Sequence, residues 1–159
     1  MSLKNLSAKI KIPKTLNSKL LDKRIKKIYD KFEKSLTLDE SFAVAVSGGP
    51  DSLALAFLAR IYSLKKRLTV KYFIVDHKLR LESTKEAQFI KKLLKKNSIS
   101  SEILTWKGKK PKNNIQSKAR ENRYALLFKN CDKSNIKNIM IGHHKDDLIE
   151  NFFIRMLRG

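Results

Sequence analysis

Short apolar runs alternate along this chain with longer segments in which apolar residues recur every three or four positions. Residues 42–46, 70–75 and 138–142 are apolar at most positions. A short apolar run suits a strand that is buried on both faces of a parallel sheet. Residues 99–106 contain a further strand with partial alternation. The pattern therefore predicts four strands.

The segments between these strands have helical periodicity. We expect helices at about residues 20–36, 50–62, 114–130 and 148–157, and another that starts at Ser83. Ser83-Thr84-Lys85-Glu86 matches a capping box, in which a hydroxyl and a carboxylate satisfy the first backbone N–H groups of a helix. On the helix of residues 114–130 we expect Arg120 to share an inward stripe with Tyr124, Leu127, Phe128 and Cys131. Strands that alternate with helices predict an α/β fold, a doubly wound parallel sheet with helices on both faces.

The chain divides into two predicted regions. Residues 1–40 form an N-terminal basic region, with a loose arm to Ser18 and then an amphipathic helix, and residues 41–159 form the α/β domain. The sequence stops at Arg158-Gly159 within a helical pattern, so we expect this domain to be incomplete at its C-terminus.

The turn after the first predicted strand has the residues of an anion site, Ser47-Gly48-Gly49-Pro50-Asp51-Ser52. A turn that opens a helix presents unpaired backbone N–H groups, and the helix dipole favours a negative ligand there. Glycines let a ligand approach the main chain, and proline is tolerated at the first helical position. Asp51 beside phosphates would be repulsive without a cation between them. The turn therefore predicts a nucleotide-phosphate site with Mg²⁺ at Asp51, although an ordinary Gly-rich turn is the simpler alternative.

Other polar residues follow the remaining strands. Asp76 and His77 come after the second strand, and His143-His144-Lys145-Asp146-Asp147 after the fourth. Ligands of open parallel sheets bind beyond the carboxyl ends of the strands. Asp147 and Glu150 lie three residues apart, so they neighbour each other on the last helix. We expect Mg²⁺ or a cationic substrate there. A zinc site and a simple helix cap are the alternatives, and Arg120 has a structural salt bridge as its alternative role.

The charge of the chain favours a polyanionic partner. Its 159 residues contain 36 Lys and Arg against 15 Asp and Glu, a formal net charge of +21. Nucleic acid is the first candidate for such a surface. Biased genome composition is an alternative source of the lysines.

Cysteine content and hydropathy predict the compartment. A single cysteine, Cys131, excludes an internal disulfide framework and is typical of a reducing compartment. No apolar run approaches the roughly 20 residues of a membrane span. We therefore expect a cytoplasmic protein without a membrane partner.

The turn at Ser47–Ser52 resembles the SGGxDS signature of PP-loop pyrophosphatases, which split ATP between its α and β phosphates. Four stretches in order closely resemble tRNA(Ile)-lysidine synthetases: residues 47–52, 75–83, 119–124 and 142–159. This likeness covers residues 41–159. Departures from the family pattern occur at Ile74, Lys78, Leu81 and Asn151, all outside the phosphate loop.

The resemblance implies a ligase that modifies the wobble cytidine of an isoleucine tRNA with a CAU anticodon. ATP would adenylate O2 of the base, and the ε-amine of free L-lysine would displace AMP from C2, which gives lysidine. It implies phosphate binding by residues 47–52, catalytic roles for Asp51 and Arg120, lysine binding by Asp147 and Glu150, and an orienting or proton-carrying role for His143. For a natural chain that ended at Gly159 we expect ATP binding without efficient lysidine formation.

Three alternatives remain. A PP-loop tRNA thiolase would need paired cysteines, which this sequence lacks. An amidotransferase partner that acts on a small substrate would have no use for the charge of +21. A non-catalytic RNA-binding fragment would keep the lysines without the reaction. A homodimer is one assembly open to the chain.

Overall fold

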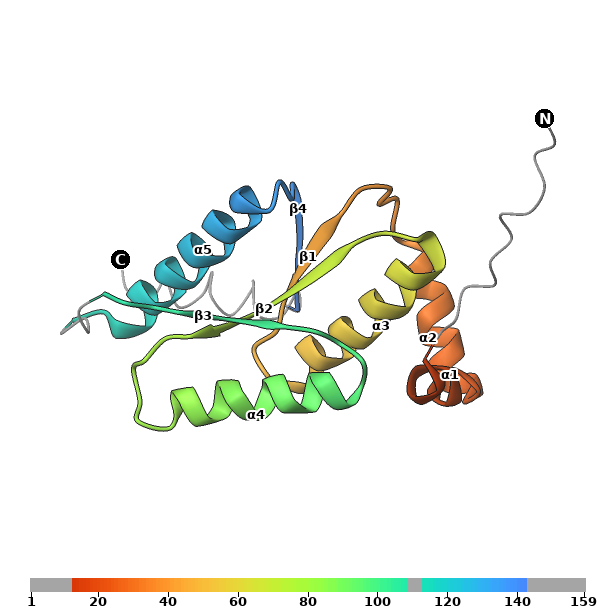
Figure 1. The fold of residues 1–159 in the computed structure, drawn as a ribbon, viewed down its shortest axis with the longest axis horizontal. Coiled ribbons are helices and arrows are strands. Elements are labelled where there is room, and N and C mark those ends of the chain that lie inside the picture. Colours follow the sequence, from red (N-terminus) through yellow and green to blue (C-terminus); the bar gives the residue numbers. More distant parts are fainter. Residues whose placement is uncertain (1–12, 109–112, 143–159) are drawn as a thin grey trace, which may run out of the picture.

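The computed structural model of this chain describes residues 13–108 and 113–142. Helices and strands alternate along the described part (Figure 1). Their bounds are α1 Lys14–Leu20, α2 Lys23–Lys34, β1 Phe42–Ala45, α3 Pro50–Lys66, β2 Val70–Asp76, α4 Ser83–Lys96, β3 Glu102–Thr105, α5 Ile115–Lys133 and β4 Asn138–Ile141. The four predicted strands are confirmed.

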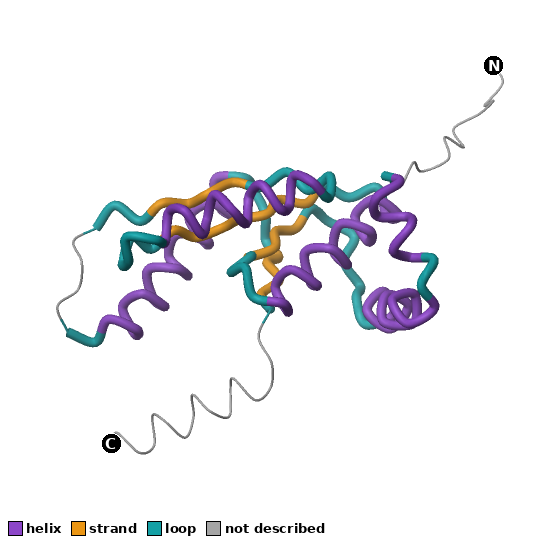
Figure 2. Tube along the Cα trace, turned by 90° about the horizontal axis from the view of Figure 1, so that it is seen from below, coloured by secondary structure: helices purple, strands orange, loops and turns teal. Residues whose placement is uncertain are grey.

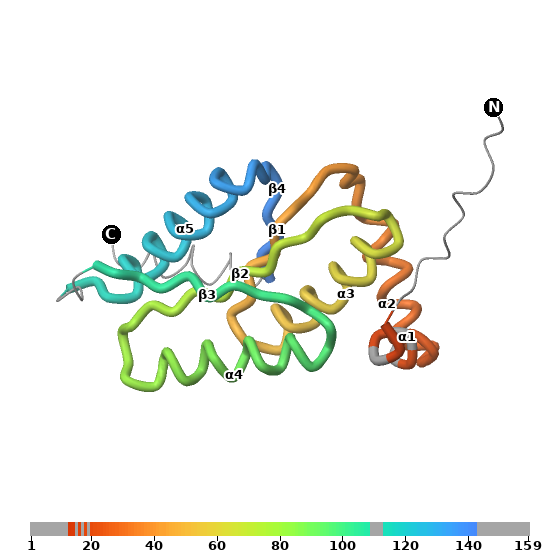
Figure 3. The backbone as a smooth tube through the Cα atoms, in the orientation of Figure 1, coloured from red at the N-terminus to blue at the C-terminus, as the bar shows by residue number. Residues whose placement is uncertain are grey.

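The strands form one parallel sheet in the order β3-β2-β1-β4. From β1 the chain moves outward to β2 and β3 and then returns along α5 to place β4 on the other side of β1 (Figure 3). The direction of winding therefore reverses between β1 and β4, and ligands of open α/β sheets bind at such a point. The turn at residues 47–52 follows β1 directly, so the fold places it at this position.

Helices cover both faces of the sheet. Alternate residues of β1 point to opposite sides, with Phe42 and Val44 in one core and Ala43 and Ala45 in the other. The first core is closed by α2, α3 and α4, and the second by α5. Figure 2 shows α4 lying across the strands that it covers. The predicted doubly wound α/β fold is confirmed.

One expectation about the N-terminal region is wrong. Residues 14–18 belong to α1 rather than to a loose arm. The helix expected at residues 20–36 is confirmed as α2, although it begins at Lys23. The side chain of Asp22 accepts hydrogen bonds from the backbone N–H groups of Arg24 and Ile25, and so caps α2 at its start. Residues 1–12 lie outside the described part.

The capping box at Ser83 is also wrong. Glu82 precedes α4 and makes no side-chain cap, although the helix begins at Ser83 as predicted. The Ser83 hydroxyl donates instead to Asp76 Oδ1 at 2.8 Å. The Glu86 carboxylate of the predicted box pairs with Arg80 instead, with 3.0 Å between Oε2 and Nη2.

Within the described residues, no helix is long and apolar enough to cross a membrane.

Candidate functional site

The turn between β1 and α3 is shaped by two glycines with different constraints. Gly48 has φ +93°, which favours glycine, and a Cβ there would collide with the Ile90 side chain of α4. Gly49 is extended at φ −68° and ψ 160° and precedes Pro50, the first residue of α3. It has no side-chain cap to offer the helix. No side chain of Gly49 therefore competes with an anion for the first backbone N–H groups of α3, where the helix dipole favours negative charge.

The hydroxyl of Ser52 lies at the centre of this turn. It accepts hydrogen bonds from the backbone N–H groups of Ser47 at 3.2 Å and Gly48 at 3.1 Å, and it donates to the Gly49 carbonyl at 2.9 Å. The Ser47 hydroxyl lies 3.1 Å from it. Ser52 is buried, whereas Ser47, Gly49, Pro50 and Asp51 are exposed. An incoming phosphate can therefore reach the rim of the turn, and Ser52 braces it from inside.

The end of β4 packs directly against the same turn. A Cβ at Gly142 would stand 3.1 Å from both Cα and N of Ser52, and these backbone atoms cannot move aside. Glycine at this position thus lets the end of β4 pack closely against the first turn of α3. His143, Asp147 and Glu150 follow Gly142 in sequence and lie outside the described residues.

A cavity of about 460 Å³ opens beside the turn, in the size range of small-molecule sites. Its polar wall comes from several elements: Ser47 and Ser52 of the turn, His77 after β2, Arg80, Ser83 and Glu86 around the start of α4, and Arg123 of α5. Apolar residues of the strands form much of the rest, among them Ala45, Val46, Phe73, Ile74 and Ile141. The arrangement suits a ligand with a flat apolar part and an anionic end.

Asp76 lies at the end of β2 and is held entirely by protein groups. Its carboxylate accepts from the Thr84 hydroxyl at 2.7 Å, the Ser83 hydroxyl at 2.8 Å and the Lys78 N–H at 3.0 Å, and the Lys78 ammonium lies 3.7 Å away. Burial raises the pKa of this carboxyl, but these hydrogen bonds and the Lys78 charge outweigh burial, so that the pKa is lowered overall. Asp76 is 1% exposed, and its role in this structure is to brace the β2–α4 connection.

His77, the next residue, lines the cavity. Its Nδ1 is buried and has no hydrogen-bond partner among the described residues. Burial lowers the pKa of the imidazole, the positive charge of Arg123 lowers it further, and Asp76 offsets part of this change. His77 is therefore neutral near pH 7 and can donate or accept one hydrogen bond from Nδ1.

Residues 17–159 match the PP-loop domain family. The chain belongs to this family. Membership implies that the domain binds ATP. We use the name PP-loop for the turn at residues 47–52, whose contacts with phosphate stay a prediction.

Curated relatives of this PP-loop domain carry the name tRNA(Ile)-lysidine synthase. The protein of Orientia tsutsugamushi (strain Boryong) is 43% identical over 117 residues, which are 74% of this chain and 26% of the relative. That of Wolbachia pipientis wMel is 43% identical over 119 residues, 74% of this chain and 28% of the relative. That of Rickettsia bellii (strain OSU 85-389) is 36% identical over 137 residues, 82% and 32% respectively. The chain thus spans about a quarter to a third of the length of these relatives.

A solved structure has the same fold. The U34-tRNA thiolase NcsA from Methanococcus maripaludis, with its [4Fe-4S] cluster, is similar with a TM-score of 0.72 over 87% of this chain and 52% of that chain. At 19% sequence identity this likeness shows the PP-loop fold and nothing about the reaction.

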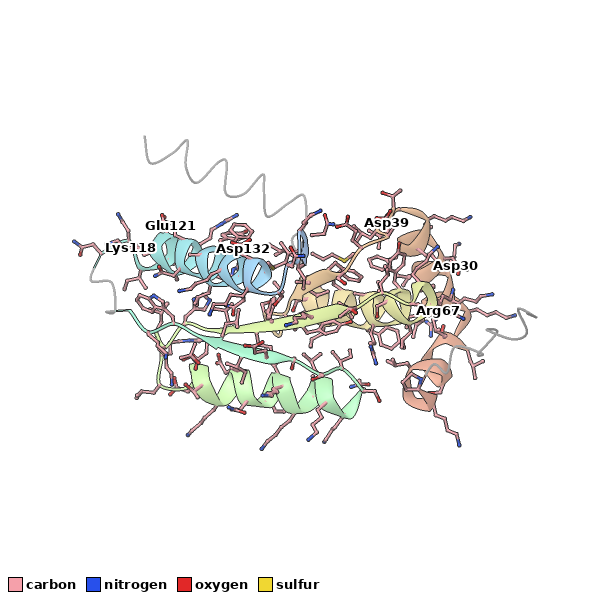
Figure 4. The ribbon with its side chains drawn as sticks, turned by 45° about the horizontal axis from the view of Figure 1, so that its top comes forward. Asp30, Asp39, Arg67, Lys118, Glu121 and Asp132 are labelled. Atoms are coloured by element: carbon pink, nitrogen blue, oxygen red, sulfur yellow. The ribbon has the colours of Figure 1, made fainter. Side chains whose placement is uncertain are left out.

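Arg120 does not line the PP-loop cavity, whereas Arg123 does. The expected inward stripe of α5 is displaced: Leu127 and Cys131 are buried, but Phe128 is 51% exposed and Tyr124 half-buried. One turn before Leu127 lies Arg123. Both arginines lie over the Tyr124 ring, Arg120 at 5.8 Å and Arg123 at 5.3 Å, and the catalytic role of Arg120 stays a prediction. The sequence pattern placed Tyr124 and Phe128 on the buried stripe of α5, but their rings stack on each other with 5.9 Å between the ring centroids. On the outer side of α5, Figure 4 labels Lys118, Glu121 and Asp132.

Asp51 suits the predicted Mg²⁺ site in its chemistry. It is an exposed carboxylate in the first turn of α3, beside the PP-loop backbone. Mg²⁺ in nucleotide sites is commonly held by one or two carboxylates together with phosphate oxygens and water. The described residues contain no cluster of three or more His, Cys, Asp or Glu that could hold a metal without such help. A Mg²⁺ ion held by Asp51 would therefore need phosphate oxygens and water to complete its coordination.

Proposed function

We propose that this PP-loop domain belongs to an enzyme that joins lysine to C2 of the wobble cytidine in tRNA(Ile) with a CAU anticodon. The observation that carries the proposal is the PP-loop turn, with its open rim and adjoining cavity of about 460 Å³, in a chain about 40% identical to proteins named tRNA(Ile)-lysidine synthase. The net charge of +21 suits a tRNA substrate.

The first step activates the base. O2 of cytidine attacks the α-phosphorus of ATP, the bond to the β-phosphate oxygen breaks, and pyrophosphate leaves. The exposed rim of the PP-loop, with Ser47 and the start of α3, holds the phosphates as negative charge moves onto the leaving group. Asp51 would hold Mg²⁺, which when bound offsets phosphate charge.

The second step forms the new carbon–nitrogen bond. The neutral ε-amine of lysine attacks C2, the bond from C2 to the AMP oxygen breaks, AMP leaves with the bonding electron pair, and the new nitrogen substituent loses one proton to base or solvent. Asp147 and Glu150 are proposed to hold the lysine, His143 to orient it or carry a proton, and Arg120 to approach the base or the activated phosphate. The segment that contains His143, Asp147 and Glu150 follows Gly142, which packs against Ser52, so the chain enters this segment directly beside the PP-loop.

Cys131 does not favour thiolase chemistry. It is the single cysteine of the sequence, lies on the buried face of α5 and is 5% exposed. Burial raises the pKa of its thiol, and nearby Asp132 raises it further. Sulfur delivery requires an accessible thiolate.

The test is ATP-dependent incorporation of labelled lysine into a tRNA(Ile) transcript with a CAU anticodon, with release of AMP and pyrophosphate. We expect the label at the wobble cytidine when the full natural protein is used, and none when that cytidine is replaced by uridine. Asp51→Ala should abolish incorporation while the affinity for tRNA stays within about twofold. Sulfur incorporation, or tRNA binding without any base modification, would instead support the thiolase or the non-catalytic RNA binder.

ATP binding is tested separately on residues 1–159. We expect ATP to raise the Tm of this domain, because a ligand that binds the folded state stabilises it by mass action. This measurement does not depend on lysine or tRNA.

A further inference from the structure

The outer face of α4 carries an exposed aromatic ring between lysines. Phe89 is 67% exposed, in contrast to Ala87 and Leu94 on the inner face. Lys85 lies four residues before Phe89 and Lys92 three residues after it, so both neighbour the ring on the same helix face, and both are exposed. Lys96 continues this row. We call Lys85, Phe89, Lys92 and Lys96 the α4 stripe. Figure 4 shows long side chains of α4 pointing away from the sheet.

One end of the α4 stripe reaches the PP-loop. Lys85 and Phe89 line a hollow of about 440 Å³ together with Ser47, Gly48, Glu86 and Ile90. Ser47, Glu86 and Ile90 also line the main cavity, so the two spaces adjoin. The close packing of Gly48 against Ile90 fixes α4 relative to the loop. A group resting on Phe89 would therefore lie next to the phosphate site.

The hollow is suited to an anion despite the carboxylate in its wall. Glu86 pairs with Arg80, whose Nη2 lies 3.0 Å from Oε2 and 3.3 Å from Oε1. This pairing offsets the negative charge of Glu86, and the lysines of the stripe leave the surface positive. A single exposed apolar side chain is ordinary on a protein surface. An exposed ring between lysines at the mouth of a nucleotide-phosphate site is a more specific arrangement.

We infer that the α4 stripe binds single-stranded RNA, with a base stacked on Phe89 and backbone phosphates contacted by Lys85 and Lys92. Unpaired bases stack on exposed aromatic rings with little regard to sequence, and lysines follow the backbone. The stripe would hold a nucleotide close to the target base while that base enters the cavity. The choice of RNA as occupant rests on the proposed function, but the binding is measurable without lysine or ATP.

The test uses a short single-stranded RNA with 5-iodouridine, a photo-crosslinker that reacts with aromatic side chains in contact. We expect a crosslink at Phe89 in the unmodified chain. Phe89→Ala should weaken RNA binding about tenfold, the scale of one stacked base, and Phe89→Tyr should retain it. Leu21→Ala, a control at another exposed apolar residue, should stay within twofold. Because Phe89 is mostly exposed, the Tm of Phe89→Ala should match that of the parent.

The lysines give a second measurement. Lys92→Ala should lower the slope of log Kd against log salt concentration by about 0.7, the loss of one phosphate contact to a single strand. Lys34→Ala on α2, also an exposed lysine, is the control and should leave crosslinking at Phe89 intact. Unchanged affinity and salt slope in Phe89→Ala and Lys92→Ala would overturn the inference. A Phe89→Ala effect on self-association alone, measured by sedimentation, would also overturn it and assign the stripe to a protein contact. Neither result would bear on lysine incorporation, which tests the proposed function.

Discussion

The ends of β1 and β2 are neighbours at one edge of the sheet, yet they use their polar groups in opposite ways. After β1 the turn is rich in glycine and hydroxyl groups, and four of its six residues are exposed. After β2 the chain places a carboxylate, Asp76, that is 1% exposed and accepts hydrogen bonds from two hydroxyls and a backbone N–H. The first end is open to a ligand, and the second is closed by the protein itself.

A position at the ligand edge of the sheet does not by itself make a residue a ligand contact. Both turns lie where parallel sheets bind ligands. Asp76 has its acceptor sites occupied by Ser83, Thr84 and Lys78, whereas its neighbour His77 faces the cavity with Nδ1 unpaired among the described residues. At the end of β2, Asp76 thus stabilises the connection to α4, while the adjacent His77 is available to contact a ligand.

The largest effect is expected from breaking the closed end. Asp76→Asn removes the charge and leaves buried hydroxyl and N–H donors poorly matched, so we expect a loss of about 3 kcal/mol in the free energy of unfolding. Urea denaturation measures it. Asp39→Asn, at an exposed site that Figure 4 labels, should change stability by less than about 0.5 kcal/mol. Equal effects of both substitutions would show that Asp76 is no brace.

The open end should be sensitive at one glycine and tolerant at the other. Gly48→Ala is expected to cost about 2 kcal/mol, because alanine is strained at φ +93° and its methyl collides with Ile90. Gly49→Ala should cost less than about 0.5 kcal/mol, since its backbone is extended and the nearest atom to a Cβ is Ser47 Oγ at 3.8 Å. Thermal or urea denaturation of both variants measures the two losses of stability. A larger loss in Gly49→Ala than in Gly48→Ala would contradict this account of the turn.

A smaller effect should separate ligand binding from folding. Ser52→Ala removes the hydroxyl that organises the PP-loop, so we expect ATP affinity to fall about tenfold, or about 1.4 kcal/mol. Isothermal titration calorimetry measures it. Ser63→Ala is the matched control, because Ser63 is also buried on α3 but its hydroxyl donates to the Arg60 carbonyl of the same helix. If both serine variants bind ATP alike, Ser52 has no special part in the loop.

The smallest effect concerns pH. The pKa of His77 is lowered from its ordinary 6.5, so the unfolded chain takes up a proton before the folded chain does, and stability falls as pH drops below about 6.5. Asp76 also has a lowered pKa, and its contribution is lost only below its ordinary 3.8. His77→Gln should therefore flatten the stability curve just below pH 6.5, while the loss below 3.8 persists. An unchanged slope in urea denaturation at these pH values would contradict the assignment.

The strands and the PP-loop were predictable because their signals are local. Apolar runs at residues 42–46 and 138–142 and the two glycines mark buried strands and a turn without any tertiary information. The inward face of α5 was not predictable from the sequence, because aromatic residues such as Tyr124 and Phe128 are typical of a core. In the structure their rings stack on each other on a partly exposed face. The partners of Asp76 were also missed, since Ser83 and Thr84 have an equally good local role as helix caps. The roles predicted for His143, Asp147 and Glu150 lie beyond the described residues.

The Ser52 hydroxyl has a consequence for how the protein meets its nucleotide. By accepting from the N–H groups of Ser47 and Gly48, it satisfies these donors from within the chain. The turn therefore has no need of an anion as a template and can take its shape during folding, before any nucleotide arrives.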